Sequence, residues 1–200
     1  TITALTLDMS NAGNAIFGND IVLAETKRLY FDATGNTSMN EVSGTDLSFY
    51  TGGAEKMRID SDGNVGIGVV PETDWHADWH ALQVGEGTLG VLTTGAQVSL
   101  AQNARGTAGS SNSSWKYIKS GYAGQYVQSG GDHYWKSAAS GSADAGITWT
   151  QGMTLTAAGK VGIGTTSPAS PTGYGTAGVL HLKGASGNDC SLVFEGMSGS

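Results

Sequence analysis

A short glycine-rich pattern occurs three times in this chain of 200 residues. The copies lie at residues 12–18, 62–68 and 158–164, and the last two share the sequence Val-Gly-Ile-Gly. Self-similarity of this kind indicates an array of small structural units rather than one enzyme-type globule. An alternating apolar segment leads into each copy, which predicts a strand that enters a tight turn at the glycine.

The repeat extends beyond its glycine turn. Related strand-like segments stand before the second and third copies, at 46–52 and 146–152, and others follow them, at 81–85 and 180–184. Because the chain starts at Thr1 without a methionine, we expect it to be a piece of a longer protein. The repeat predicts four parts: a partial repeat at 1–24, a unit with a connector at 25–96, a unit at 97–178 with an aromatic-rich insertion at 103–152, and the start of a further unit at 179–200.

The composition favours an all-β fold. Glycine contributes 32 residues and charged residues only 14% of the chain. Runs that alternate apolar and polar residues are bounded by Gly, Asn and Ser clusters, which is typical of short strands joined by tight turns. No amphipathic helix longer than about two turns is found by the same counting.

Such short strands make a poor core within one chain. A single unit of about 50 to 90 residues would be marginally stable by surface-to-volume scaling. We therefore expect copies of the chain to wind around a common axis, which also removes exposed strand edges. The alternating glycines either admit a close neighbouring backbone or only ease a bend. The side chains expected to form the interior of this assembly are Val65, Ile67, Val161 and Ile163.

Charge and cysteine content exclude several classes of function. The net charge is −7, which argues against a protein that tracks nucleic-acid phosphates. No apolar stretch reaches the 18 or more residues that a membrane-spanning helix needs. The single cysteine, Cys190, excludes an intrachain disulfide, and its apolar neighbours predict a small buried side chain in a strand.

The repeat resembles a known family. Residues 57–68 are similar to the repeat of tail fibres and tailspikes of bacterial viruses, and the third copy with its Thr-Thr-Ser-Pro extension is more similar still. The first copy departs from the pattern because it has Ile16 and Phe17. The resemblance covers most of residues 45–184. Further segments follow in the order found in fibres of viruses of aquatic bacteria: 81–85, 114–118, 134–135 and 147–151.

The resemblance implies a trimeric, intertwined β shaft, often ahead of a self-cleaving chaperone domain, with the insertion as a small β-rich knob. It further implies a structural, non-enzymatic role in an extracellular tail fibre of the virion, together with other tail or fibre proteins and without a cofactor. The shaft would extend and present a host-receptor-binding surface. Two alternatives stay open: a tailspike that depolymerises polysaccharide, and a cellular extracellular fibre or adhesin.

Two segments contain candidate metal ligands. Residues 60–64 begin like a calcium loop, but the closing Glu is missing, so a hairpin turn is the preferred interpretation. The duplicated segment 74–80 would place His76 and His80 on one face of a short helix, as in zinc sites. We prefer an interpretation in which its tryptophans pack this connector onto the shaft, and we predict no metal.

Aromatic residues concentrate in the insertion. They form either a small aromatic core or a platform that stacks sugar rings of a host glycan, and any receptor contact is predicted here. A glycan-cleaving site would need two carboxylates about 5 to 10 Å apart. The main acidic residues, Asp132 and Asp144, lie on Gly- and Ser-rich turns without obvious partners, so we predict no enzyme. The candidate contact residues are Trp115, Tyr117, Tyr122, Tyr126, Tyr134 and Trp135.

Overall fold

The structure is a computed structural model, and it describes residues 22–23, 27–42, 44–107, 114–170, 178–184 and 190. Within this part of the chain all regular structure is β-strand and none is helix, which confirms the all-β prediction. No membrane-spanning helix is therefore found among these residues. The first copy of the repeat, at 12–18, lies outside them.

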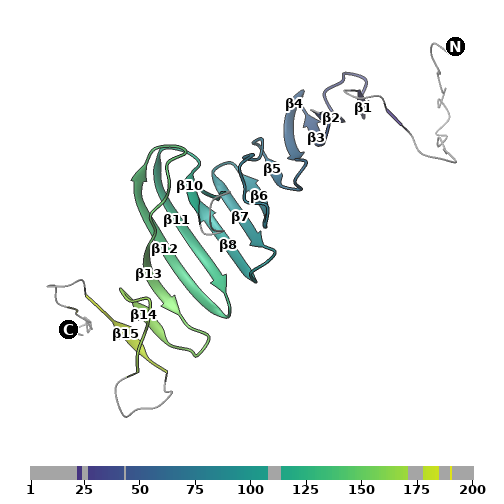
Figure 1. The fold of residues 1–200 in the computed structure, drawn as a ribbon. Helices are drawn as coiled ribbons and strands as arrows, with labels where there is room; N and C mark the ends of the chain where they lie inside the picture. The colour runs from purple at the N-terminus through teal and green to yellow at the C-terminus, as the bar shows by residue number, and fades with distance from the viewer. Residues whose placement is uncertain are drawn as a thin grey trace, which may run out of the picture.

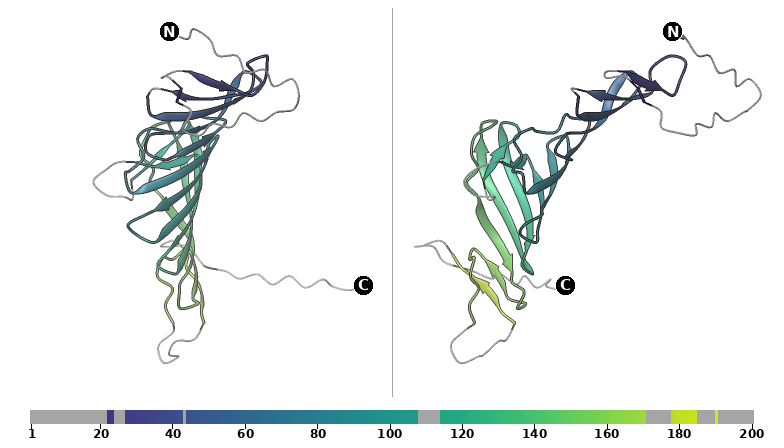
Figure 2. Two further views of the ribbon diagram at one scale, coloured as in Figure 1. Left: turned by 90° about the vertical axis from the view of Figure 1, so that its right-hand side faces the viewer. Right: turned by 45° about the vertical axis from the view of Figure 1, so that its right-hand side comes forward.

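Thirteen strands form one long, twisted sheet (Figure 1). The strands stack along its length from β1 at one end to β15 at the other, as two further views also show (Figure 2). Its members are β1 (Arg28–Tyr30), β2 (Ser38–Val42), β3 (Asp46–Thr51), β4 (Ala54–Ile59), β5 (Val65–Ile67), β6 (Trp79–Val84), β7 (Gly87–Leu92), β8 (Gln97–Gln102), β11 (Gly121–Ser129), β12 (Asp132–Gly141), β13 (Thr150–Leu155), β14 (Val161–Ile163) and β15 (Leu180–Leu182).

The second and third repeats fold alike. β4 and β5 form an antiparallel hairpin and β5 then pairs in parallel with β6; β13, β14 and β15 repeat both pairings. Each turn closes with the same backbone hydrogen bond, from Asp60 N to Asn64 O and from Thr156 N to Lys160 O, both at 2.9 Å. Gly63 and Gly159 take the left-handed conformation that such turns require. The predicted glycine turn is confirmed in both repeats.

The alternating glycines of these repeats have two different roles. A Cβ on Gly66 would overlap the carbonyl oxygen of Val69, and one on Gly162 would lie 2.8 Å from Thr165 O. The backbone that approaches so closely is therefore the chain's own connector. Gly68 and Gly164 have positive φ angles of 70° and 72°, which lets the chain bend out of the strand.

Most of the insertion at 103–152 belongs to the main sheet. Its long strands β11 and β12 continue the sheet after β8. Only β9 (Ala104–Gly106) and β10 (Trp115–Tyr117) form a separate two-stranded sheet. The expected knob is thus a small second layer, because the alternation that identifies a strand does not reveal which sheet the strand joins.

An aromatic core lies between this second layer and the main sheet. Trp79 and Trp115 meet edge to face with ring centroids 5.4 Å apart, and both are buried. Glycines make room for such rings: a Cβ on Gly90 would lie 2.9 Å from the Trp79 ring. Trp75 is also buried, which confirms that the tryptophans of segment 74–80 pack the connector in place. The short helix considered as an alternative for this segment is not formed, since the segment makes a tight turn and an isolated bridge from Trp75 to Thr107.

Candidate functional site

Strand register aligns apolar side chains into one continuous line across the main sheet. Paired residues of neighbouring strands point to the same face, so the pairings can be followed from strand to strand. Eleven adjacent strands, β3 to β8 and β11 to β15, each contribute one member. This apolar row consists of Leu47, Ile59, Val65, Leu82, Leu89, Leu100, Tyr126, Trp135, Met153, Ile163 and Leu182.

The apolar row is partly open to solvent in a single chain, because four of its members are exposed and the other seven are half-buried. Leu100 is 58% exposed and Ile163 is 45% exposed. Further exposed apolar residues flank the row on the same face, among them Val84, Val98 and Leu180. Full burial of such a side chain is worth about 1.5–3 kcal/mol, and contiguous exposed apolar surface marks an interaction site. The row is therefore the strongest candidate functional surface.

The opposite face of the sheet buries polar side chains as well as the aromatic core. Polar side chains there are buried by neighbouring residues, connectors and the second layer. Many use their polar groups within the chain: Thr88 Oγ1 donates to Ala104 O, and Gln125 Nε2 donates to Ser99 Oγ, both at 2.8 Å. The buried polar residues of this face include Ser48, Gln83, Thr88, Ser99, Gln125 and Thr154.

The four side chains expected in a trimer interior all lie on the apolar face. Val65 and Ile163 are members of the row. Ile67 and Val161 lie two residues away on the same strands and pair with Val84 and Leu180. The structure thus places these residues on one surface, and their burial by other copies stays a prediction.

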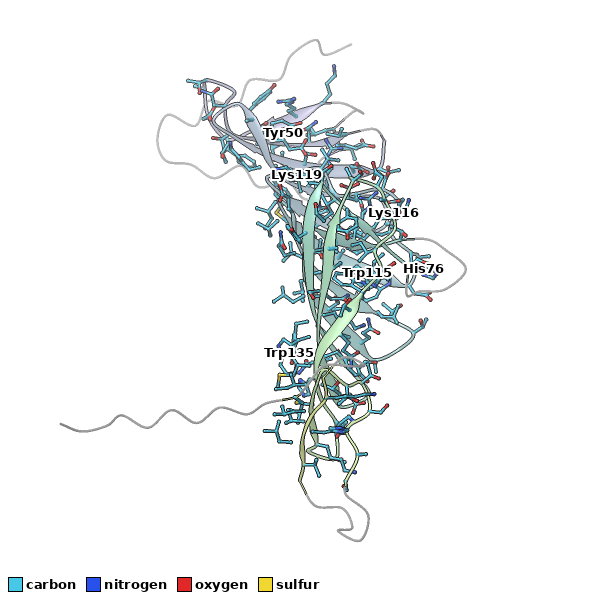
Figure 3. All side chains as sticks on the ribbon, turned by 90° about the vertical axis from the view of Figure 1, so that its left-hand side faces the viewer. Tyr50, His76, Trp115, Lys116, Lys119 and Trp135 are labelled. Atoms are coloured by element: carbon cyan, nitrogen blue, oxygen red, sulfur yellow. The ribbon has the colours of Figure 1, made fainter. Side chains whose placement is uncertain are left out.

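The six candidate contact residues do not form one platform. Trp115 and Tyr117 are buried in the aromatic core, whereas Tyr126 and Trp135 belong to the apolar row. Figure 3 shows Trp135 and Trp115 on opposite sides of the sheet. Tyr134 is half-buried and donates to Asp132 Oδ2, and Tyr122 is 73% exposed. For the two buried residues, the aromatic-core interpretation is correct.

A histidine that the sequence did not single out lies beside the two aromatic members of the row. Tyr126 Oη and His133 Nδ1 are 2.5 Å apart, and Gln128 Nε2 lies 3.4 Å from the same nitrogen. The His133 ring stacks on Trp135 with an interplanar angle of 19°. We call Tyr126, His133 and Trp135 the aromatic node.

A second unanticipated feature is an ion-pair cluster around the buried Arg105 on β9. Arg105 Nε lies 2.6 Å from Asp74 Oδ1, and its Nη2 lies 2.6 Å from Asp144 Oδ1. Lys116 on β10 adds a contact of 2.9 Å to Asp74. Burial raises the pKa of Asp74, but hydrogen bonds from Arg105 and Lys116 outweigh it and hold the pKa below its usual value. The cluster ties the connector and a distant turn to the second layer.

The acidic residues considered as catalytic or metal-binding candidates make hydrogen bonds and ion pairs within the chain. Asp132 accepts hydrogen bonds from Ala157 N and Tyr134 Oη, and Asp144 pairs with Arg105, so the expectation that these two acids lack partners is wrong. Asp60 accepts from two backbone N–H groups of its own turn. Within the described ranges no three His, Cys, Asp or Glu side chains are placed to hold a metal.

Cys190 is exposed, so the expectation of a buried cysteine in a strand is wrong. Its apolar sequence neighbours carried that prediction, and such neighbours do not determine which way a side chain points.

No protein-family model matches this chain, and no curated protein matches it either.

Proposed function

We propose that this chain is a structural segment of a homotrimeric fibre, with the apolar rows of three copies packed around a common axis. The observation that carries the proposal is the contrast between the two faces. The apolar row runs through eleven neighbouring strands with four members exposed and the others half-buried, while the other face buries polar side chains together with the aromatic core. Burial of the exposed face by a partner would complete the core that one chain lacks.

A copy of the same chain fits the row better than an unrelated partner. The partner must present apolar surface along the whole line of eleven strands, and another copy does so because it carries the same apolar row. A closed arrangement about an axis satisfies every copy equally and limits further growth. The choice of three copies comes from the resemblance to viral fibre shafts.

The repeat supports the assignment of the fibre to the tail of a bacterial virus, outside the host cell and joined to other tail or fibre proteins. In this proposal the shaft extends and presents a surface that contacts a host receptor, such as a surface glycan. Trp115 and Tyr117 are buried, so within the described part of the insertion Tyr122 is the most exposed aromatic candidate for that contact.

A matched pair of substitutions tests the assembly. Leu100 in the row and Val70 in a connector are 58% and 55% exposed, so a charge is equally accessible to water at both positions in a single chain. Leu100→Asp should abolish the trimer in sedimentation velocity, whereas Val70→Asp should leave it intact. Equal behaviour of the two variants would contradict the assignment of the row as the interface.

Antibody labelling tests the location. Antibodies raised against the purified chain should decorate the tail appendages of the virus in electron micrographs. Decoration of fibres on bacterial cells without virus would instead support the cellular adhesin. Release of new reducing ends from host polysaccharide would support the depolymerase.

A further inference from the structure

The aromatic node places a titratable side chain in the middle of the apolar face, beside two members of the row. His133 lies on β12, two residues from Trp135, and therefore points to the side of the apolar row. Its cross-strand partners on that face are Gln128 on β11 and Leu155 on β13, both uncharged. Imidazole is the side chain that changes charge between about pH 5 and 8.

The contacts of His133 suit a neutral ring. Gln128 Nε2 carries only donor hydrogens, so its position 3.4 Å from Nδ1 suits a ring in which that nitrogen accepts. Tyr126 Oη, 2.5 Å from Nδ1, can either donate to this nitrogen or accept from it. Protonation of Nδ1 would turn this acceptor into a donor and oppose the Gln128 contact.

Among the residues that the structure describes, no carboxylate on the apolar face is positioned to neutralise an imidazolium at position 133. Asp132, the adjacent residue, points to the other face, where its carboxylate accepts from Ala157 N and Tyr134 Oη. The Ala157 N–H is the main reason that the pKa of Asp132 is lowered, and the charge of His133 is a smaller one. Tyr126 and Trp135, which contact the ring on the apolar face, carry no charge.

We propose that His133 makes association of the apolar rows acid-sensitive, because a neutral imidazole can be covered by partner chains whereas an imidazolium cannot be covered without cost. The inference rests on the proposed assembly and adds a regulatory property to it. At neutral pH the node contributes three aromatic rings to the covered row. At mildly acidic pH the charged ring favours the separated chains, in which it keeps contact with water.

Sedimentation or dilution experiments on the full chain at about pH 8 and about pH 5.5 test this property. The dissociation constant of the trimer should increase at least about tenfold at the lower pH. His133→Gln and His133→Phe should each remove most of that increase. His181→Gln, a control on the opposite face at β15, should keep it.

The outcomes separate this inference from the proposed function. A chain that is monomeric at both pH values contradicts the trimer itself. A trimer whose dissociation constant is the same at both pH values contradicts the role of His133. An acid response that persists undiminished in His133→Phe contradicts it as well, even if His133→Gln fails to assemble at pH 8.

Discussion

The two sides of the main sheet between β6 and β12 differ in how far the chain's own residues cover them. On one side, the second layer and the connector pack over the strands, with Trp79 and Trp115 in the core between them. The ion pairs of Arg105 join the second layer to the connector. The other side carries the apolar row without a cover from the described residues. One chain thus covers only one side of its sheet, and in the proposed assembly other copies cover the second side.

The side chains of the covered face explain why the chain can close it alone. Glycines at 90, 106 and 141 leave room for tryptophan and tyrosine rings, and small polar residues hydrogen-bond within the chain. The face with the apolar row cannot be stabilised by water, because Val, Leu and Ile side chains form no hydrogen bonds with it. Substitutions on the two sides should therefore damage different properties.

The largest effect is expected on the uncovered side. Ile163→Asp would place three carboxylates in the trimer interior, at several kcal/mol for each buried charge. The variant should keep its β-sheet circular dichroism but sediment as a monomer. Thr166→Asp, an exposed neighbour outside the strand, should remain trimeric. Trimers of unchanged stability in Ile163→Asp would show that the row is not the interface.

A substitution on the covered side should weaken the fold without separating the chains. Trp115→Ala removes the ring that contacts both Trp79 and Trp149, which should cost about 3–5 kcal/mol of unfolding free energy. Urea denaturation measures this loss, and sedimentation below the transition should still report a trimer. If Trp115→Ala instead produced a folded monomer, the two sides would not have separate roles.

A smaller effect is expected where a repeat packs against its own connector. Gly66→Ala forces a Cβ against Val69 O and Pro71, and overpacking of this kind typically costs about 1–3 kcal/mol. Gly146→Ala is the control because a Cβ there meets open space. In thermal denaturation Gly66→Ala should melt at a lower temperature than Gly146→Ala. Equal melting temperatures would show that the connector can shift to accommodate the added Cβ without cost.

The smallest predicted effect concerns acid and the covered side. The pKa of Asp74 is lowered in the folded chain, so its contribution to stability is present above the unfolded pKa and is lost as pH falls through the folded value. Because the carboxylate is 38% exposed, we expect less than about 1 kcal/mol. Asp74→Asn should melt lower at pH 7 and lose less stability on acidification to pH 3. If the stability of the parent chain and of Asp74→Asn fell equally between pH 7 and pH 3, this ion pair would not contribute to stability.

The sequence alone predicted local features well. The Val-Gly-Ile-Gly pattern and its flanking alternation correctly identified the turns, the strands and the common face of Val65 and Ile163. The row as a whole was not predictable, because it depends on the register of eleven strands. Arg105 pairs with Asp74 and Asp144, which are separated from it by 31 and 39 positions in the sequence, and no local pattern predicts pairs so far apart. The second layer was mistaken for a knob for the same reason.

The mass of the purified chain in solution tests the central claim most directly. Sedimentation equilibrium at neutral pH over a wide range of concentrations should give three times the mass of one chain, with the apolar rows protected inside. A well-folded monomer at every concentration would contradict the claim that the uncovered side of the sheet is completed by other copies of the chain.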